Sequence, residues 1–510
     1  MLLKLSERKR RWLGFISVVS AIALIFTDQS ILPVAIPTIQ RDFQTTSFQT
    51  QWMINAYFLS MSIFILASGT ITDIIGRRRI FLLGLSTFLF ASLFCAIAMN
   101  SIWLISFRVV QGIGGAMMIP SSYAILLDLF PADKRGFAVG LNTAVGSFFL
   151  VAAPYIGGVF TQYLSWRWVF WINIPICFVG QIFAILAIEK PEIEKEKFDF
   201  KGFFLFALFM LCFILAFMQA KEWGWISPGI ILLFIFAIIF FIFFVTIVKK
   251  NTKNPFLDFS LFKSKGYKIV SMIIILIVLA FSITIFWPIY YQYLLSFSPT
   301  KAGIASLIGA APVMIMAPVA GNLMDRFSPK LPIIIGLFLL LFAFIWFTIF
   351  FKTGSLMLLM PGLLMLGAGA SFAFTPAFAY GITSVPNKIR GMATGVLGTF
   401  RNGGLAIGIA VFGSVILNVE HLFFSHDLEK SVSTSKLTPA MFDGLLAKAP
   451  EALDALNKLP KNVQEIVKNG YFTSSMSAFL IANIIAGSII FLLIIYVLIS
   501  FKTKKKKRAN

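Results

Sequence analysis

The sequence predicts an all-α protein that crosses a membrane many times. Of its 510 residues, 59% are hydrophobic and 13% are charged, whereas soluble domains carry about 25% charged residues. The mean hydropathy is +0.90. Apolar stretches of about twenty residues recur along the chain, and this is the length that an α-helix needs to span a bilayer. These observations favour a polytopic membrane protein and argue against a soluble enzyme.

Fourteen stretches are long and apolar enough to be transmembrane helices. The first begins like a secretory signal, with a basic segment before an apolar core. Its apolar pattern continues past residue 30 and further spans follow, so we expect it to remain as an uncleaved helix. The predicted helices cover residues 12–36, 50–72, 79–99, 103–127, 137–161, 168–188, 202–219, 228–248, 267–290, 302–324, 331–350, 355–380, 391–417 and 472–499.

The lysines and arginines between these stretches predict the topology. An even number of helices places both termini on one side of the membrane, and 30 of the 43 basic residues fall on that side. The alternate loops hold 11, six of them in the long loop at 418–471. Because basic residues in short loops accumulate in the cytoplasm, we expect both termini to be cytoplasmic. The net charge of +22 then follows from topology and does not indicate a nucleic acid partner.

A charged hinge between the second and third predicted helices organises the chain. Residues 69–79 read GTITDIIGRRR, in which Gly69 precedes Asp73 by four positions and Gly76 precedes three arginines that begin at Arg77. Each arginine would cost about 2.5 to 3.5 kcal/mol at the centre of a membrane helix. The hinge must therefore lie in water.

A weaker copy of this hinge indicates an internal duplication. Gly321, Asp325 and Arg326 lie between two later apolar runs, and the glycine and the aspartate each follow their counterparts by 252 residues. By the helix count the two hinges are eight helices apart, whereas two six-helix halves would place them six apart. The excess predicts two helices inserted between the halves.

Asp28 is the acidic residue that lies deepest within a predicted helix, because the other 20 fall in loops or near helix ends. At a rise of 1.5 Å per residue it lies roughly 24 Å from the start of its helix, in the outer half of the bilayer. Isolated acids inside membranes mark ion pathways, so Asp28 is the candidate proton-binding residue. The alternatives are an acid neutralised by a structural partner and one near enough to the outer surface to stay hydrated.

Two arginines, Arg108 and Arg401, lie inside the fourth and thirteenth predicted helices. Each must find a carboxylate, a carbonyl or a bound anion. Gln111 lies on the same helix face as Arg108, and Gly112 and Gly114 permit a close helix approach. Proton coupling and structural bracing both stay open for Arg108. Arg401 is a candidate substrate contact, with bracing as the preferred alternative.

The fifth predicted helix combines Gly146, Pro154, Gly157 and Gly158. Proline removes a backbone hydrogen bond and kinks a helix, while glycines allow close packing. This helix is therefore expected to pack closely and to bend during gating, with a static kink as the alternative.

The segment 418–471 is polar, with six lysines, seven acids and three prolines. Amphipathic stretches such as EALDALNK predict short helices on the outer surface, either covering a vestibule or forming a passive hairpin. His421 and His426 alone do not indicate a metal site.

No motif in the sequence indicates catalysis or a bound cofactor. The three cysteines, Cys95, Cys177 and Cys212, lie in apolar runs without the spacing of a disulfide framework or a metal cluster. There is no GxxxxGK[ST] nucleotide-binding motif, and both histidines lie outside the predicted helices. We therefore expect a protein that is not an enzyme, has no cofactor or metal, and draws on an ion gradient.

Three motifs, in this order, resemble the signatures of the major facilitator superfamily. They occupy residues 69–78, 108–114 and 154–158. The helix count, Asp28 in TDQSILPVAIP and the sequence SWRWVFWINIP at 165–175 are similar to the drug:proton antiporter branch. The resemblance covers nearly the whole chain and implies the major facilitator fold, with two six-helix bundles plus two inserted helices.

The resemblance also implies roles for individual residues. Asp73 and Arg77 would form a cytoplasmic latch that holds the outward-open state, with Asp325 and Arg326 as its degenerate counterpart. Arg108 would assist proton coupling. The helix with Gly146, Pro154, Gly157 and Gly158 would be the antiporter motif, and Asp28 would match the first-helix acid that binds protons or cations. The departures from the family pattern are Phe149 and Ala153 in place of glycines, and Ser30 and Pro33 in place of threonine and asparagine.

The expected division of the chain follows from the duplication and the insert. Residues 1–190 form the first six-helix bundle, and 191–265 contain the inserted helices with their flanking loops. Residues 266–500 form the second bundle, including the outer loop 418–471, and 501–510 are a basic tail.

We expect a proton-coupled antiporter that exports amphipathic small molecules, such as lipophilic cations in multidrug efflux, by alternating access. The alternatives are export of an anionic metabolite or siderophore, uptake by proton symport, and a receptor or scaffold without flux. The expected setting is the lipid bilayer of a bacterial inner membrane, with a monomeric protein. The expected pocket residues are Asn55, Tyr57, Gln111, Asn142, Trp287, Tyr291 and Arg401.

Overall fold

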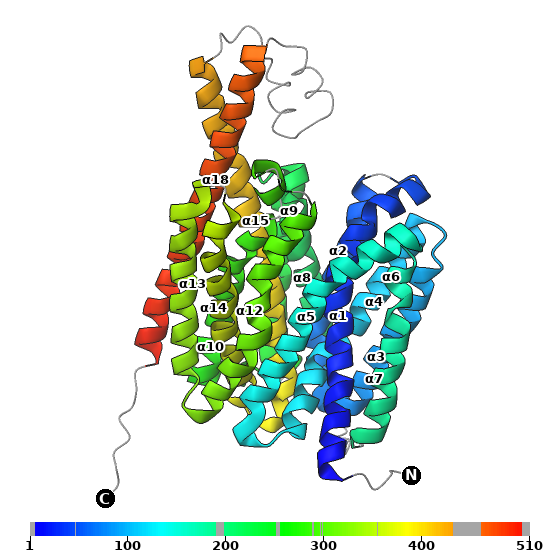
Figure 1. Cartoon of the computed structure of the whole chain (residues 1–510). Helices are drawn as coiled ribbons and strands as arrows, with labels where there is room; N and C mark the ends of the chain where they lie inside the picture. Colours follow the sequence, from blue (N-terminus) through cyan, green and yellow to red (C-terminus); the bar gives the residue numbers. More distant parts are fainter. Residues whose placement is uncertain are drawn as a thin grey trace, which may run out of the picture.

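The structure is a computed structural model and is all-helical in the residues that it describes (Figure 1). These residues contain no β-strand. Fourteen of their helical segments are long and apolar enough to cross a membrane, so the predicted fold class and helix count are confirmed. The described residues are 6–45, 47–189, 198–250, 255–287, 290–295, 297, 299–353, 355–431 and 461–501.

The first six spans form one bundle. Gly76 separates the second span from the third with a φ of 102°, a conformation that glycine adopts without strain. Pro154 lies inside the fifth span, and Ile172 separates the two pieces of the sixth. The helices are α1 (Glu7–Phe43), α2 (Ser47–Ile75), α3 (Arg77–Ala96), α4 (Ser101–Leu129), α5 (Arg135–Tyr163), α6 (Trp168–Trp171) and α7 (Asn173–Ala187), with a short 3-10 helix at Ala132–Lys134.

The last six spans form the second bundle. The first of them changes from α-helix to a 3-10 segment, Ser282–Phe286, and is followed by a π-helical turn at Tyr290–Leu294. The α-helices are α10 (Lys265–Phe281), α12 (Pro299–Arg326), α13 (Lys330–Phe350), α14 (Leu356–Thr383), α15 (Arg390–Ser431) and α18 (Lys461–Ser500), with short 3-10 helices at Phe259–Lys263, Phe351–Thr353 and Asn387–Ile389.

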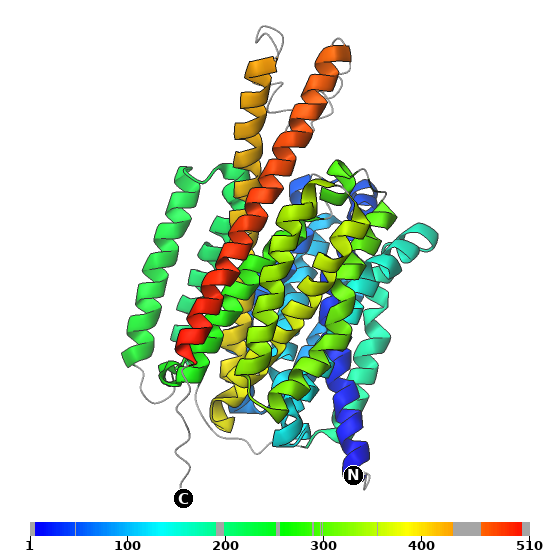
Figure 2. The same ribbon diagram turned by 60° about the vertical axis from the view of Figure 1, so that its left-hand side comes forward.

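Two inserted helices, α8 (Phe200–Trp223) and α9 (Pro228–Lys250), form a hairpin outside the two bundles (Figure 2). Asp199 begins α8 by accepting a hydrogen bond from the backbone N–H of Gly202 at 2.9 Å. The α8 helix contacts both α2 and α15, whereas α9 packs mainly on α8. The insert therefore lies against a seam between the two bundles. The spacing of the two hinges predicted the insert itself.

The helices α15 and α18 extend far beyond the other spans on one side of the molecule (Figures 1 and 2). They contain 42 and 40 residues, which corresponds to about 60 Å each against a hydrocarbon thickness of about 30 Å. Residues 418–431 and 461–471 thus continue these helices, so the prediction of surface-lying helices is wrong there. EALDALNK, residues 451–458, lies outside the described residues.

The first helix begins and the last helix ends on the opposite side of the molecule (Figure 1). We call this the terminal side, and the side with the long α15 and α18 extension the hairpin side. The latter name refers to α15 and α18 and not to the inserted hairpin of α8 and α9.

Candidate functional site

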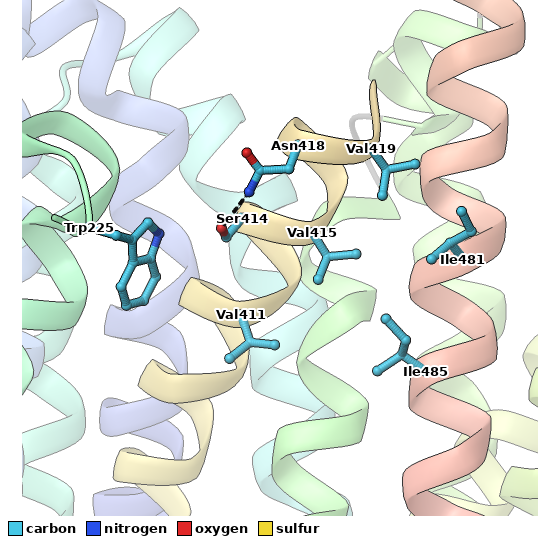
Figure 3. Close-up of a pocket in the computed structure, with 8 residues that line it drawn as sticks. All are labelled: Trp225, Val411, Ser414, Val415, Asn418, Val419, Ile481 and Ile485. Carbon is cyan, nitrogen blue, oxygen red and sulfur yellow. Dashed lines mark hydrogen bonds between the residues drawn. The ribbon is translucent and has the colours of Figure 1, made fainter. Parts of the chain in front are cut away.

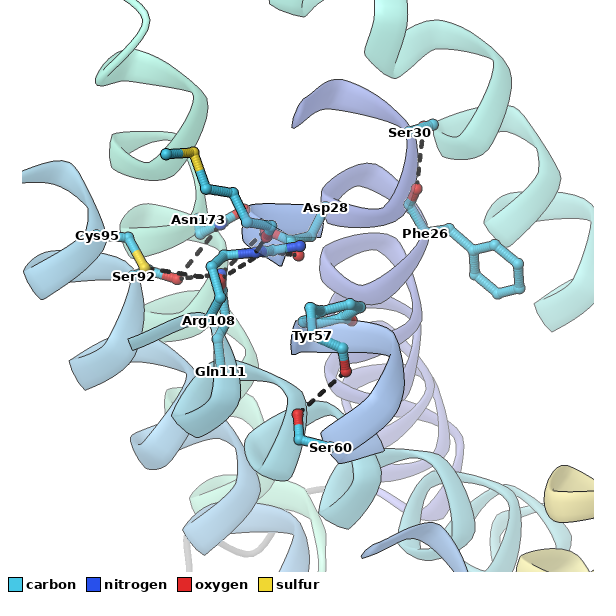
Figure 4. Close-up of polar contacts among 11 residues, drawn as sticks. Phe26, Asp28, Ser30, Tyr57, Ser60, Ser92, Cys95, Arg108, Gln111 and Asn173 are labelled. Atoms are coloured by element: carbon cyan, nitrogen blue, oxygen red, sulfur yellow. Dashed lines mark hydrogen bonds and ion pairs between the residues drawn. The ribbon is translucent and has the colours of Figure 1, made fainter. Parts of the chain in front are cut away.

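Asp28 is completely buried inside the first bundle and forms an ion pair with Arg108 (Figure 4). The Arg108 Nη1 atom lies 2.5 Å from Asp28 Oδ2, and Gln111 Nε2 donates to Asp28 Oδ1 at 3.0 Å. The helices α1 and α4 contribute these residues. The prediction of an isolated acid is therefore wrong, and the alternative of a neutralising partner describes this structure.

Arg108 has further partners that are neutral. Its Nε donates to the carbonyl oxygen of Met53 at 3.0 Å, and its Nη1 donates to Gln111 Oε1 at 2.7 Å. Its guanidinium carbon lies 4.4 Å from the centre of the Tyr57 ring. Neutral acceptors and an aromatic face thus remain for Arg108 when the Asp28 charge is removed.

The network continues through residues that the sequence did not single out. Gln111 Nε2 also donates to Ser92 Oγ at 3.0 Å, and Asn173 Nδ2 donates to the same oxygen at 3.3 Å. A Cβ atom at Gly112 would lie 2.4 Å from the carbonyl oxygen of Tyr57, so only glycine allows α4 to approach α2 this closely. Asn173 could have been found from the sequence, because it belongs to the SWRWVFWINIP motif. Ser92 could not, because a serine in an apolar helix does not stand out.

The glycines of α5 pack against α1 on both sides of Asp28. A Cβ atom at Gly146 would lie 3.0 Å from the Phe26 ring, and one at Gly157 would lie 2.6 Å from Ile31. The nearest atom to a Cβ at Gly158 is 3.9 Å away, so that position requires no glycine. The predicted close packing of the fifth span is thus observed, and its partner is the helix that carries Asp28.

On the terminal side, Asp73 joins the first bundle to the second. Its carboxylate oxygens accept hydrogen bonds from the backbone N–H groups of Gly391, at 2.9 Å, and Met392, at 2.8 Å, in the first turn of α15. A Cβ atom at Gly69 would lie 2.4 Å from the Gly391 carbonyl oxygen. Gly69 therefore lets the helices touch, and Asp73, one turn later, caps the facing helix.

The second copy of the hinge makes the same contact in the reverse direction. Asp325 accepts hydrogen bonds from the backbone N–H groups of Gly136 and Phe137 in the first turn of α5, both at 2.9 Å. A Cβ atom at Gly321 would lie 2.0 Å from the Gly136 carbonyl oxygen. Each bundle therefore caps a helix of the other, and we call these two contacts the paired latches.

The arginines of the two hinges differ. Arg77 forms an ion pair with Asp128, and its Nη2 donates to the carbonyl and side-chain oxygens of Asn387 in the second bundle, at 3.0 Å each. Gly76, at the bend between α2 and α3, places Arg77 at the start of α3. Arg326 is exposed and has no corresponding contact within the described part of the chain, so its expected place in the latch is not observed.

The predicted pocket residues do not converge on one place. Tyr57 and Gln111 belong to the Asp28 network. Asn55 is half-buried on α2. Trp287 and Tyr291 are buried in the second bundle, where their rings pack against other aromatic side chains of that bundle. These two residues are therefore part of its core.

Arg401 and Asn142 form a second group, between the bundles. The Arg401 guanidinium carbon lies 5.4 Å from the centre of the Phe26 ring of α1. The Tyr123 hydroxyl of α4 lies close to both the Arg401 charge and the Asn142 side chain. Asn142 is fully buried, and neither of its polar side-chain atoms has a hydrogen bond of ordinary geometry in the described residues. Phe26 and Tyr123 were missed because aromatic residues in apolar helices give no sequence signal.

On the hairpin side, two residues of the SWRWVFWINIP motif, Trp166 and Arg167, form hydrogen bonds that connect the ends of helices. Trp166 Nε1 and Arg167 Nη1 both donate to Asp42 Oδ2, at 2.9 and 3.2 Å. Arg167 Nη2 also donates to the carbonyl oxygen of Ala98 at 3.1 Å. The hydrogen bond from Trp166, followed by the contact with Arg167, lowers the pKa of Asp42, an exposed carboxyl whose slight desolvation acts in the opposite direction.

A groove of about 460 Å³ lies towards the hairpin side, away from the Asp28 network and the paired latches (Figure 3). Its walls are mainly apolar, and its polar end is marked by a hydrogen bond from Asn418 Nδ2 to Ser414 Oγ at 3.0 Å. The lining residues are Trp225, Val411, Ser414, Val415, Asn418, Val419, Ile481 and Ile485.

Known proteins resemble the chain in sequence and in fold. The multidrug resistance protein Stp of Mycobacterium tuberculosis is 30% identical over 404 residues, which cover 77% of this chain and 73% of Stp. The riboflavin transporter RibZ of Clostridioides difficile is 28% identical over 82% of this chain and 91% of RibZ. The solved structure of the proton:xylose symporter XylE superimposes with a TM-score of 0.58 at 13% identity, over 96% of each chain, and shows the fold alone.

The family assignment rests on most of the chain. Residues 18–409 match the family model of the Major Facilitator Superfamily. This range includes the Asp28 network, the paired latches and the inserted helices. The arrangement of two bundles and the relatives agree with the match. The chain is therefore a multi-pass membrane transporter and belongs to the major facilitator superfamily.

Proposed function

We propose that this transporter exports amphipathic small molecules in exchange for protons, by alternating access. The observation that carries the proposal is the buried ion pair of Asp28 and Arg108, at membrane depth in α1 and α4. Ionisable residues inside membranes are costly and mark ion pathways. The names of the relatives Stp and RibZ support a small-molecule substrate and do not identify it.

The geometry supports a cycle in which the ion pair opens and closes. When a proton neutralises Asp28, its attraction to Arg108 is lost, and Arg108 keeps the Met53 carbonyl and Gln111 Oε1 as acceptors. Movement of α1 would be transmitted to α5, because the two helices pack through Gly146 and Gly157. The start of α5 is in turn held by Asp325 of the second bundle. Protonation would therefore bias the contact between the bundles.

The paired latches join the two bundles on the terminal side, and we propose that they close this side and that it faces the cytoplasm of a bacterial cell. The bias of lysines and arginines towards this side supports that orientation. In this state Asp28 would take up its proton from the exterior, and the proton would leave to the cytoplasm after the latches open. A site that loads protons outside and releases them inside couples proton entry to substrate exit.

The test is gradient-driven flux in proteoliposomes with an imposed pH difference, with ethidium, riboflavin and the anion naphthalenesulfonate as separate probes. For a transported probe, wild-type protein is expected to accumulate it on the acidic side, and Asp28→Asn is expected to lose at least nine-tenths of the gradient-driven component. Glu7→Gln is the matched control, because Glu7 is an exposed acid at the start of the same helix.

Three other outcomes would contradict the proposal. Gradient-driven flux that persists in Asp28→Asn would exclude this residue as the proton carrier. Flux that ignores the pH difference would exclude proton coupling. Accumulation on the alkaline side would indicate symport in place of exchange.

A further inference from the structure

The two arginines within the spans differ in how their charges are satisfied. Arg108 has one carboxylate, two neutral acceptors and an aromatic face as partners. Arg401 is half-buried and makes no hydrogen bond or ion pair with any residue that the structure describes. Its guanidinium carbon lies over the face of Phe26, 5.4 Å from the centre of the ring. A structural brace needs a polar partner, so bracing does not account for Arg401.

Arg401 lies in the region where a substrate would bind. It is eleven residues beyond Arg390, the start of α15, which places it about 16 Å from that helix end and near the middle of the bilayer. Its neighbours Phe26 and Tyr123 belong to the opposite bundle. The guanidinium therefore lies between the two bundles, as expected for the central site of a transporter of this architecture.

The charge of this region is positive. Asp28 and Arg108 cancel each other within the first bundle. The two latch aspartates lie near helix ends on the terminal side and are occupied with backbone N–H groups. Among the described residues no carboxylate forms an ion pair with Arg401. A membrane-buried cation without a protein counter-ion needs an anion from elsewhere.

The surroundings of Arg401 supply further recognition groups. Asn142 is fully buried, and neither its amide nitrogen nor its amide oxygen makes a hydrogen bond of ordinary geometry among the described residues. Tyr123 lies beside it, with the centre of its ring 4.8 Å from that of Phe378 in the second bundle. A cation, an unpaired amide and aromatic faces from both bundles are thus grouped at one level of the transporter.

We infer that Arg401 binds an acidic group of the substrate, so that the exported molecules are amphipathic anions, such as aromatic carboxylates. The guanidinium offers parallel N–H donors that match a carboxylate, Asn142 adds an amide donor, and Phe26 and Tyr123 contact the apolar body. The inference rests on the proposed export function for its direction. It also predicts selectivity by charge, whether or not protons drive transport.

The test compares three naphthalene probes that differ in charge: naphthaleneacetate, naphthaleneacetamide and naphthylethylamine. Binding is measured by equilibrium dialysis against protein in lipid nanodiscs at pH 7.5, with empty nanodiscs as the blank. Wild-type protein is expected to bind the acid at least tenfold more tightly than the amide or the amine. Arg401→Gln is expected to lose that preference, and Arg401→Lys to retain a large part of it.

The control variant is Lys249→Gln, which removes one positive charge from an exposed position at the end of α9. It should leave the preference for the acid unchanged. Thermal unfolding of each variant checks that it is folded. A further variant, Asn142→Leu, keeps Arg401 and should weaken binding of the acid at least threefold. Failure of wild type to bind the acid, a preference for the amine, or an unchanged preference in Arg401→Gln would overturn the inference. Because no pH gradient is applied, failure of proton coupling would not alter this result.

Discussion

At the scale of single residues, the ion pair of Asp28 and Arg108 is the basis of the proposed coupling. A buried ion pair returns little net stability, because both charges lose their hydration. Losing one partner is costly, since the other charge then stays buried and uncompensated. Brief protonation of Asp28 is therefore tolerable, whereas permanent removal of either side chain would destabilise the protein.

Replacing one member of the pair should destabilise the protein much more than replacing both. Arg108→Leu or Asp28→Leu alone is expected to cost about 3 to 5 kcal/mol, whereas the double variant should recover a large part of this loss. Unfolding by denaturant in detergent micelles measures these differences as a double-mutant cycle. Single variants within about 1 kcal/mol of wild type would show that the pair is not formed as described, since the expected cost for a buried pair is larger.

The contact of Asp42 with Trp166 and Arg167 should respond to acid on the hairpin side. The pKa of Asp42 in the folded protein is lowered, so its stabilising contribution is present above the unfolded value of about 3.9 and is lost as the pH falls through the folded value. Wild type should therefore lose slightly more thermal stability than Asp42→Asn between pH 6 and pH 3. An equal loss in both would contradict this assignment.

Single residues also show what the sequence can reveal. Asp28, Arg108 and Gln111 stand out because charged and amide groups are costly within apolar helices. Their pairing could not be predicted, since it depends on how α1 and α4 are rotated against each other. For the same reason Trp287 and Tyr291, which pack in the second bundle, were not separable from residues of a pocket.

At the scale of helices, the paired latches explain why glycine and aspartate recur four positions apart. The glycine removes the side chain where two helices cross, and the aspartate reaches the free N–H groups of the facing helix. The sequence predicted both hinges, but not that the aspartate of each hinge caps a helix of the opposite bundle. Arg326 shows the limit of motif comparison, because its counterpart Arg77 contacts Asn387 while Arg326 is exposed.

Removing either aspartate should open the terminal side. A helix cap of this kind contributes about 1 kcal/mol, which replacement by alanine removes, so Asp73→Ala and Asp325→Ala are each expected to raise the ratio of open to closed protein about fivefold. Spin labels at Arg79→Cys and Arg326→Cys, exposed positions in opposite bundles, would report a longer distance by pulsed electron paramagnetic resonance. An unchanged distance distribution in both variants would contradict a latch function.

The ends of α15 and α18 show why some helices are longer than predicted. Apolarity identifies the part of a helix that lies in lipid, and it does not detect a helix that continues into water. Residues 418–431 and 461–471 are polar, yet they continue α15 and α18. The two extensions support each other, since Ser475 donates a hydrogen bond to Glu420 and the Phe424 and Tyr471 rings meet edge to face.

At the scale of the whole molecule, the inserted hairpin makes two equivalent halves unequal. The α8 helix contacts α2 of the first bundle and α15 of the second, the same two helices that one of the paired latches connects. Thr70 of α2 also donates to the carbonyl oxygen of Phe256, which follows the insert, at 3.0 Å. The helix count and the offset of the hinges were enough to predict the insert, but not the seam that it covers.

The proposed orientation can be tested with single cysteines. A cysteine at Asn100, exposed on the hairpin side, should react with a membrane-impermeant maleimide in intact cells. A cysteine at Lys134, exposed on the terminal side, should react only after the membrane is permeabilised. Cys95 and Cys177 are buried and should give little background, and Cys212, which is half-buried, is replaced by serine in both variants. The reverse pattern would invert the topology and with it the direction of proton flow.

The projection of α15 and α18 beyond the bilayer has a practical consequence. Most of a transporter of this size is hidden by detergent or lipid, which leaves electron cryomicroscopy few landmarks for aligning particles. A two-helix stalk standing clear of both bundles offers an accessible epitope, and an antibody fragment bound there would serve as a fiducial without obstructing the movement between the halves.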